Sequence, residues 1–493
     1  MVLSLKNCEY AYELEKLTAC FFPSEHVTVV IDGKYKDGRE APTDFSEDII
    51  FLQCASFDDK TRISVKFKDA ELFECGNFDC CSLSESCDSL ELHCAQLLYK
   101  VLCKATGLDL GWGILTGIRP SKLLIRLIEE KGEEKAVEYF KNAFLVSESK
   151  TRLALSVAYA EKAIMMSSDV DDFSLYISIP FCPSRCSYCS FVSSAVNTSS
   201  ALKIVEPYFE NLIEEIKFTA EIVKQCNIKM KSAYVGGGTP STLSAEQIKI
   251  LLRTIRENFD MSNCSEFTFE AGRPDTITKA KLEACLCYGV DRISINPQTM
   301  SDDVLKGVGR HHTAKDCIDI YNLAKDVGFT NINMDLIAGL PGDTYEGFCD
   351  SLQKVIALKP SSITVHALAF KRSSDLSYED GHFEHTKTAR AMIDFANDEL
   401  YKAGFMPYYM YRQAKSVGNL ENVGWCKEGF ESKYNIFMME ECHTILSCGA
   451  GAVTKLVNGK EISRIFNFKY PFEYNDRFEE LIERKKAVLD FYG

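Results

Sequence analysis

Three cysteines in one short segment are the residues of this chain whose types and spacing most clearly suit chemistry. Cys182, Cys186 and Cys189 follow an apolar run with the spacing Cys-x3-Cys-x2-Cys, and Pro183 and Ser187 oppose helix formation between them. Structural zinc takes four ligands, usually as two short pairs, and no second pair lies nearby. A cubane iron–sulfur cluster takes one thiolate per iron. Three cysteines therefore predict a [4Fe-4S] cluster with one iron open to a ligand from outside the protein.

The elements that must position this loop alternate between strand and helix. Six β-branched runs are each followed by a helical pattern, and they begin near Leu175, Ser232, Glu266, Arg292, Thr330 and Ser362. Successive strand–helix units predict an α/β fold with a parallel sheet and helices packed outside it. Six units favour a partial (βα)6 barrel, open on one side, over a closed barrel of eight units. A doubly wound sheet is the alternative.

Polar or glycine residues stand at the ends of these strands, where parallel barrels carry their active sites. A glycine turn follows the second strand, and its backbone can approach a ligand closely because glycine has no side chain. An acid in an apolar strand needs a partner. Any one of these residues is equally consistent with a structural role, whereas the succession argues for a ligand site. They are Gly237, Gly238, Thr239, Glu270, Gln298 and Asp335.

The motifs together resemble the radical S-adenosylmethionine (SAM) superfamily. The segments LYISIPFC, YVGGGTPS, RISINPQTM, GVGRHHT and DLIAGLPGDT narrow the resemblance to the oxygen-independent coproporphyrinogen III oxidase family and its HemZ-type branch. The resemblance covers residues 175–372 and extends more weakly into both flanks. It implies a radical SAM barrel with two cofactors, a [4Fe-4S] cluster and SAM. In that superfamily SAM occupies the open iron and is cleaved to methionine and a 5′-deoxyadenosyl radical.

The resemblance also implies roles for individual residues. It makes Cys182, Cys186 and Cys189 the ligands of the [4Fe-4S] cluster. Matching motif positions imply SAM binding by Tyr176, Tyr188, Gly237, Gly238, Thr239, Glu270, Gln298, Arg310, Asp335, Ile337 and Ala369. No catalytic residue beyond the cofactors is implied.

The reaction implied by the resemblance is oxidative decarboxylation of two propionates of coproporphyrinogen III to vinyl groups, giving protoporphyrinogen IX. The expected partners are this tetrapyrrole and a low-potential electron donor, a flavodoxin or ferredoxin. One departure keeps alternatives open: the core family has a fourth cysteine two residues after the third, and here Ser190 and Phe191 follow Cys189. The related haem chaperones share that departure, but YNIFMM lacks their His-Asn pattern. A haem-binding chaperone and a radical SAM enzyme acting on another tetrapyrrole are the alternatives.

The flanking segments differ in pattern from the central one. We expect an N-terminal α+β domain over residues 1–168, the barrel over 169–405, and a small C-terminal domain over 406–493 that covers the substrate. A tetrapyrrole with four carboxylates needs apolar or aromatic surface and a few cations. The tail offers candidates that are equally explicable as ordinary residues of a small domain, namely Tyr408, Tyr409, Tyr411, Arg412, Trp425 and Arg464.

The net charge, the apolar runs and the cysteine count of the whole chain argue against some classes of protein. The chain has 493 residues, a formal net charge of −15 and 21 cysteines. This charge opposes nucleic-acid binding, which demands positive surface, and no apolar run reaches the ~18 residues of a membrane span. With no recognisable signal peptide, we expect a cytoplasmic protein whose other cysteines are mostly core residues. A second metal site in the N-terminal segment is disfavoured because no Cys-x2-Cys pair occurs among Cys75, Cys80, Cys81, Cys87, Cys94 and Cys103 near His93.

Overall fold

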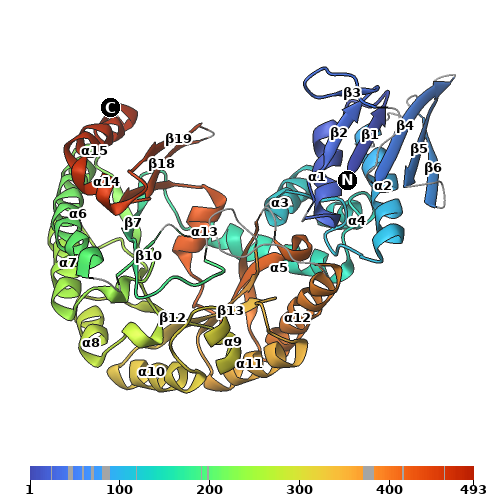
Figure 1. Ribbon diagram of the computed structural model, residues 1–493. Coiled ribbons are helices and arrows are strands. Elements are labelled where there is room, and N and C mark those ends of the chain that lie inside the picture. The colour runs from blue at the N-terminus through green and yellow to red at the C-terminus, as the bar shows by residue number, and fades with distance from the viewer. Residues whose placement is uncertain are drawn as a thin grey trace. The chain divides into compact units, whose positions relative to one another are not determined.

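The computed structural model forms two compact units (Figure 1). It describes residues 1–492 except 24, 43–47, 58–59, 68–71, 80–88, 118, 190, 192, 197–198, 370–381, 414–415 and 460. Unit 1 comprises Met1–Ala158, Ser377–Ala391 and Met410–Glu421. Unit 2 comprises Tyr159–Leu376, Met392–Tyr409 and Asn422–Gly493. Within the described residues, no helix is long and apolar enough to cross a membrane.

Unit 1 is built on a six-stranded mixed sheet in the order β3-β2-β1-β4-β5-β6. Strand β1 runs parallel to β2 and β4, and the other neighbours are antiparallel. Ser89 caps helix α2 (Leu90–Thr106) by accepting from Leu92 N, and Gly107 ends the helix in the left-handed conformation. The elements are β1 (Val2–Lys6), α1 (Ala11–Phe21), β2 (Thr28–Ile31), β3 (Lys34–Tyr35), β4 (Ile49–Phe57), β5 (Lys60–Phe67), β6 (Leu72–Asp79), α2 (Leu90–Thr106), α3 (Pro120–Lys131), α4 (Glu133–Asn142) and α5 (Glu148–Met165), whose last residues enter unit 2.

Unit 2 confirms the six expected strand–helix units. Their strands lie side by side in chain order and pair in parallel. They are β7 (Asp172–Ile179), β10 (Lys229–Gly237), β11 (Phe267–Gly272), β12 (Arg292–Gln298), β13 (Asn331–Ala338) and β14 (Ser362–Ala367). Nearly every residue of these strands is buried, which explains why they read as apolar runs and not as alternating patterns. The sheet is therefore the expected partial barrel.

The helices between these strands follow one another around the outside of the sheet (Figure 1). Helix α7 begins with a capping box in which Ser244 and Gln247 bond reciprocally to each other's backbone, and its apolar face is buried. The helices are α6 (Ser199–Cys226), α7 (Ala245–Asn258), α8 (Lys279–Cys287), α9 (Asp302–Gly307), α10 (Ala314–Val327), α11 (Tyr345–Leu358) and α12 (His382–Lys402).

The tail adds strands to both ends of the same sheet. Strand β16 pairs antiparallel with β14, and β17 pairs in parallel with β7, from Thr444 opposite Phe173 to Cys448 opposite Ile177. The full order is β15-β16-β14-β13-β12-β11-β10-β7-β17-β18-β19. The tail elements are β15 (Met406–Arg412), β16 (Glu421–Cys426), α13 (Lys433–Glu440), β17 (Thr444–Cys448), β18 (Val453–Asn458), β19 (Glu461–Phe466), α14 (Pro471–Asp476), α15 (Phe478–Lys485) and α16 (Ala487–Tyr492).

Candidate active site at the strand ends

The cysteine loop follows the first strand of the barrel. Cys182 ends the two-residue strand β8 (Phe181–Cys182), which pairs in parallel with β9 (Ser194–Ala195). A tight turn then carries the other two thiols, with Cys189 N donating to Cys186 O at 3.0 Å. Burial raises the pKa of Cys189, and the nearby charges of Cys182 and Cys186 raise it further. A cation bound among them would reverse that effect and favour thiolates.

Arg273 ties this loop to the third strand, and the sequence analysis did not select it. Its side chain is only 3% exposed. One guanidinium nitrogen donates to Ser184 Oγ at 2.7 Å and lies 4.0 Å from Cys186 Sγ. Asp275 holds the other side of the guanidinium at 2.8 Å. Arg273 thus places a buried positive charge beside the thiols, where thiolate ligands need compensation.

Arg310 ties the loop to the fourth strand. It donates through Nε to the Tyr188 hydroxyl at 3.0 Å and through a terminal nitrogen to Asn296 O at 2.5 Å. Burial raises the pKa of Tyr188, and the positive charge of Arg310 opposes that rise. The structure therefore brings two predicted residues, Tyr188 and Arg310, into direct contact beside the cysteine loop.

The glycine turn packs directly against the same loop. Gly238 has no room for a side chain, since a Cβ there would lie 2.7 Å from Phe181 O. Gly237 has φ +111°, a conformation that other residues rarely adopt. Thr239 N donates to Phe181 O at 2.7 Å, and its hydroxyl donates to Cys182 Sγ at 3.4 Å. The close approach of the two backbone segments explains Gly238, and the positive φ explains Gly237.

Three tyrosines stack on one another next to Glu270. The ring centroids of Tyr176 and Tyr234 are 6.3 Å apart, and Tyr434 of α13 lies 6.1 Å from the first and 4.5 Å from the second. The Tyr234 hydroxyl donates to Glu270 at 2.5 Å. Burial raises the pKa of Glu270 to about 7. The aromatic faces and this carboxyl form a mixed apolar and polar surface that the strand-end motifs alone did not predict.

Two further predicted residues lie on the fourth and fifth strands: Gln298 ends β12, and Asp335 lies within β13. Gln298 is 8% exposed and has φ +69°, and its side-chain oxygen is buried without a hydrogen-bond partner. Burial alone would raise the pKa of Asp335, but hydrogen bonds from His366, Asn333 and Thr364 outweigh it and lower the pKa. Asp335 is therefore the partnered acid that the apolar strand required, whereas Gln298 keeps an acceptor free for a ligand.

The remaining predicted residues differ in their surroundings. Ile337 is buried on β13, and Ala369 is half-buried just after β14. The candidates for tetrapyrrole binding in the tail are distributed over both units. Tyr408, Tyr409 and Trp425 are buried in unit 2, Tyr411 and Arg412 belong to unit 1, and Arg464 pairs with Glu441 at 2.8 Å.

This constellation fits a [4Fe-4S] cluster and SAM. The loop supplies three thiols that lie close enough for the charges of Cys182 and Cys186 to act on Cys189. Two buried arginines lie beside that loop. The glycine turn supplies close backbone approach, and Gln298 supplies an unpaired buried acceptor. A small polar ligand with cationic and anionic groups matches such a surface.

Comparisons with known proteins place this fold and site in a class. Residues 176–355 match the family model described as the radical SAM superfamily. The solved structure titled "Coproporphyrinogen III oxidase (HemN) from Escherichia coli is a Radical SAM enzyme" superposes with a TM-score of 0.50 at 22% identity, covering 66% of this chain and 72% of that one. The molecule is a radical SAM protein, and the cofactors of that superfamily are a [4Fe-4S] cluster and SAM.

Relatives in sequence identify the family within this superfamily. "Oxygen-independent coproporphyrinogen-III oxidase-like protein HemZ" of Bacillus subtilis is 39% identical over 394 residues, which is 78% of each chain. "Heme chaperone HemW" of Haemophilus influenzae is 30% identical over 317 residues, covering 64% of this chain and 78% of the relative. The chain belongs to the HemZ family of coproporphyrinogen-III oxidase-like radical SAM proteins.

Proposed function

We propose that this protein decarboxylates two propionates of coproporphyrinogen III oxidatively, giving protoporphyrinogen IX without oxygen. The observation that carries the proposal is the constellation at the strand ends, in a chain that is 39% identical to a protein named coproporphyrinogen-III oxidase-like. The name of the HemN structure, which shares the fold, points to the same substrate. A low-potential flavodoxin or ferredoxin is the proposed electron donor.

Within this proposal the chain's own residues hold and shield the cofactors. Cys182, Cys186 and Cys189 bind the cluster. SAM is held by the strand-end residues, namely Tyr176, Tyr188, Gly237, Gly238, Thr239, Glu270, Gln298, Arg310, Asp335, Ile337 and Ala369. When bound, the two cofactors supply a radical that abstracts hydrogen from a propionate side chain. The protein positions the substrate relative to the cofactors and excludes water, as in other cofactor enzymes.

Two features of the described residues support these separate roles of the cofactors and the protein. The glycine turn packs against the cysteine loop through its backbone, because neither Gly237 nor Gly238 has a side chain to hold the two segments apart. The stacked rings of Tyr176, Tyr234 and Tyr434 form a rigid wall next to Glu270. Such a wall excludes water and gives a flat organic ligand an apolar face.

The test is an anaerobic turnover assay on cluster-reconstituted protein with SAM, a low-potential reductant and coproporphyrinogen III. We expect protoporphyrin together with 5′-deoxyadenosine. Cys186→Ala should lose both products because it removes a cluster ligand. Cys317→Ala is the matched control, since this thiol of α10 is equally buried and lies outside the loop. Deoxyadenosine without any protoporphyrin, under every donor tried, would contradict the assignment of substrate.

A second candidate function is haem binding and delivery. It is favoured by the absence of a fourth cysteine after Cys189 and by the 30% identity to a protein named haem chaperone. In that case the protein should retain one haem per chain through gel filtration and should release it to an acceptor protein. Turnover of coproporphyrinogen without haem retention would rule this candidate out.

A further inference from the structure

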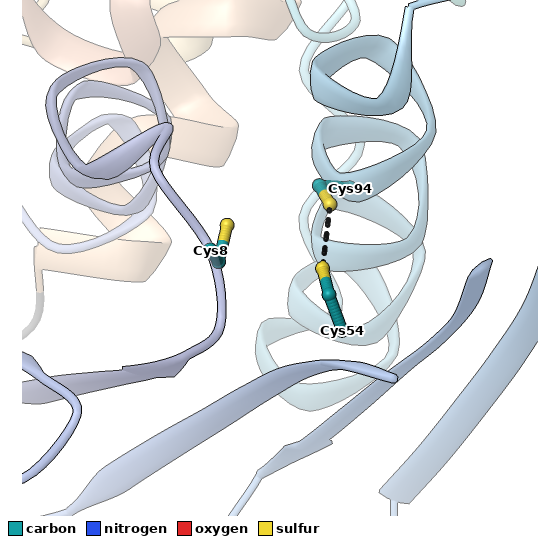
Figure 2. Close-up of side chains that lie close together, drawn as sticks. All are labelled: Cys8, Cys54 and Cys94. Carbon is teal, nitrogen blue, oxygen red and sulfur yellow. Dashed lines mark hydrogen bonds between the residues drawn. The ribbon is translucent and has the colours of Figure 1, made fainter. Parts of the chain in front are cut away.

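Three buried thiols of unit 1 lie together in a place that the radical SAM chemistry does not use. Cys8, Cys54 and Cys94 have sulfurs that all lie within 4.8 Å of one another, and Cys54 and Cys94 are 3.6 Å apart. Figure 2 shows the side chains of Cys54 and Cys94 pointing toward each other, with Cys8 across from them. Among the described residues this is the only group of three or more His, Cys, Asp or Glu ligand atoms with such spacing.

Three different elements bring the thiols together. Cys54 lies on β4, Cys94 on α2, and Cys8 on the segment between β1 and α1. The parallel register pairs Lys6 of β1 with Gln53 of β4. Cys8 lies two residues after Lys6, and Cys54 lies one residue after Gln53. Asn7 fixes the segment, because its side-chain amide donates to Cys54 O at 3.3 Å. The thiols are therefore positioned by sheet register and helix packing.

The surroundings of the thiols are apolar. Cys8, Cys54 and Cys94 are 4%, 3% and 0% exposed, and all belong to the hydrophobic core of unit 1. Hydrogen bonding with Cys54 and Cys94 lowers the pKa of Cys8 and raises the pKa of both partners. The core cluster to which the three thiols belong consists of hydrophobic side chains. An ion bound here must therefore leave a complex of little or no net charge, since uncompensated buried charge is costly.

We propose that Cys8, Cys54 and Cys94 form a three-coordinate site for a soft, thiophilic ion of the copper(I) or arsenic(III) type. Sulfurs about 2.3 Å from a central ion in a trigonal arrangement are roughly 4 Å from one another, a value between the observed 3.6 Å and the 4.8 Å limit. Zinc is a poorer match because a structural site takes four ligands. Thiolate ligands select soft ions.

Charge balance favours arsenic(III) of these two ions. Arsenic(III) enters as the neutral hydroxide, and each of the three thiols gives its proton to one hydroxide as an arsenic–sulfur bond replaces an arsenic–oxygen bond. Three waters leave, the complex is neutral and no electrons are exchanged. Copper(I) bound by three thiolates would carry two negative charges, so we expect it to bind more weakly in this apolar place. The site is independent of the proposed function.

The experiment uses the full chain with its [4Fe-4S] cluster reconstituted, so that the loop thiols are occupied. The protein is reduced with a phosphine and incubated with arsenite in one arm. The other arm supplies copper(I) in the presence of a chromogenic copper(I) chelator. Bound metal is measured after gel filtration, and the number of sulfur ligands is measured by X-ray absorption at the arsenic or copper edge. Variants are Cys8→Ser, Cys54→Ser and Cys94→Ser, with Cys285→Ser, a buried thiol of unit 2, as the control.

We expect one ion per chain with three sulfur ligands in at least one arm. Each of the three site variants should lower the bound ion at least tenfold, and Cys285→Ser should leave it unchanged. The arm that binds identifies the ion. Failure of both ions to bind, equal binding by all variants, or a coordination shell of two sulfurs would overturn the proposal. The sulfur count on the unmodified chain decides the matter even where a variant fails to fold.

Discussion

The buried carboxyl of Glu270 should make the stability of unit 2 fall as pH rises through the neutral range. Burial raises the pKa of Glu270 from 4.5 to about 7 in the folded protein. Between these two values the folded state binds more protons than the unfolded state, so stability decreases with pH. At 1.36 kcal/mol per pKa unit, the whole effect is about 3 kcal/mol, of which about 2 kcal/mol is lost between pH 5 and pH 7. Glu270→Gln removes the titration and should flatten this slope.

The assay is urea unfolding at several pH values, in the absence of SAM. The chain has two tryptophans, Trp112 in unit 1 and Trp425 in unit 2, so a Trp112→Phe background lets fluorescence report on unit 2 alone. The pH slopes are compared with and without Glu270→Gln. Asp335→Asn is an instructive control, because the charge of Asp335 helps to raise the pKa of Glu270. That variant should move the sloping range to lower pH without abolishing it. Equal slopes with glutamate and glutamine at position 270 would refute the reasoning.

Three further substitutions test the packing that positions the site. Gly238→Ala should destabilise unit 2 by about 1–3 kcal/mol and lower the yield of bound cluster, whereas Gly307→Ala, which meets open space, should change neither thermal unfolding nor cluster absorbance. Arg310→Lys should weaken SAM binding at least tenfold in equilibrium dialysis, because a lysine cannot serve both hydrogen-bond partners of the guanidinium. Lys485→Met leaves the buried Glu215 carboxylate without the partner it has at 2.5 Å, so the urea midpoint should show a loss of about 3–5 kcal/mol.

The sequence predicted the parallel core of the fold because its strands are buried on both faces. Each of the six strands begins within a few residues of the expected position, as Arg292 and Ser362 do without any offset. Strand β17 was not predicted. Its five residues lie in a short apolar run of the aromatic tail, and its neighbour β7 is about 270 residues earlier in the chain. Local pattern carries no information on pairing across such a separation.

The site was predicted unevenly for a similar reason. Gly238 could be selected by its position after a strand, and Arg310 by its place in the motif GVGRHHT that carries the resemblance. Arg273 also follows a strand end, and that signal was available, but its contact with Cys186 depends on how the loop folds back. Cys8, Cys54 and Cys94 have spacings of 46 and 40 residues, which match no metal motif. Sheet register and the packing of α2 on the sheet bring them together.

The absence of a fourth cysteine does not leave the cluster loop loosely held. The loop is fixed from three strands: Thr239 bonds to Cys182, Arg273 lies beside Cys186, and Arg310 holds Tyr188, the residue before the last thiol. Two of these contacts come from buried guanidinium groups, which oppose the negative charge that accumulates when thiolates bind iron. Fixed arginines compensate such a charge, whereas a further thiolate would add to it. We therefore expect the three loop cysteines to bind the cluster without a fourth, and we expect the missing cysteine to bear on the choice of substrate.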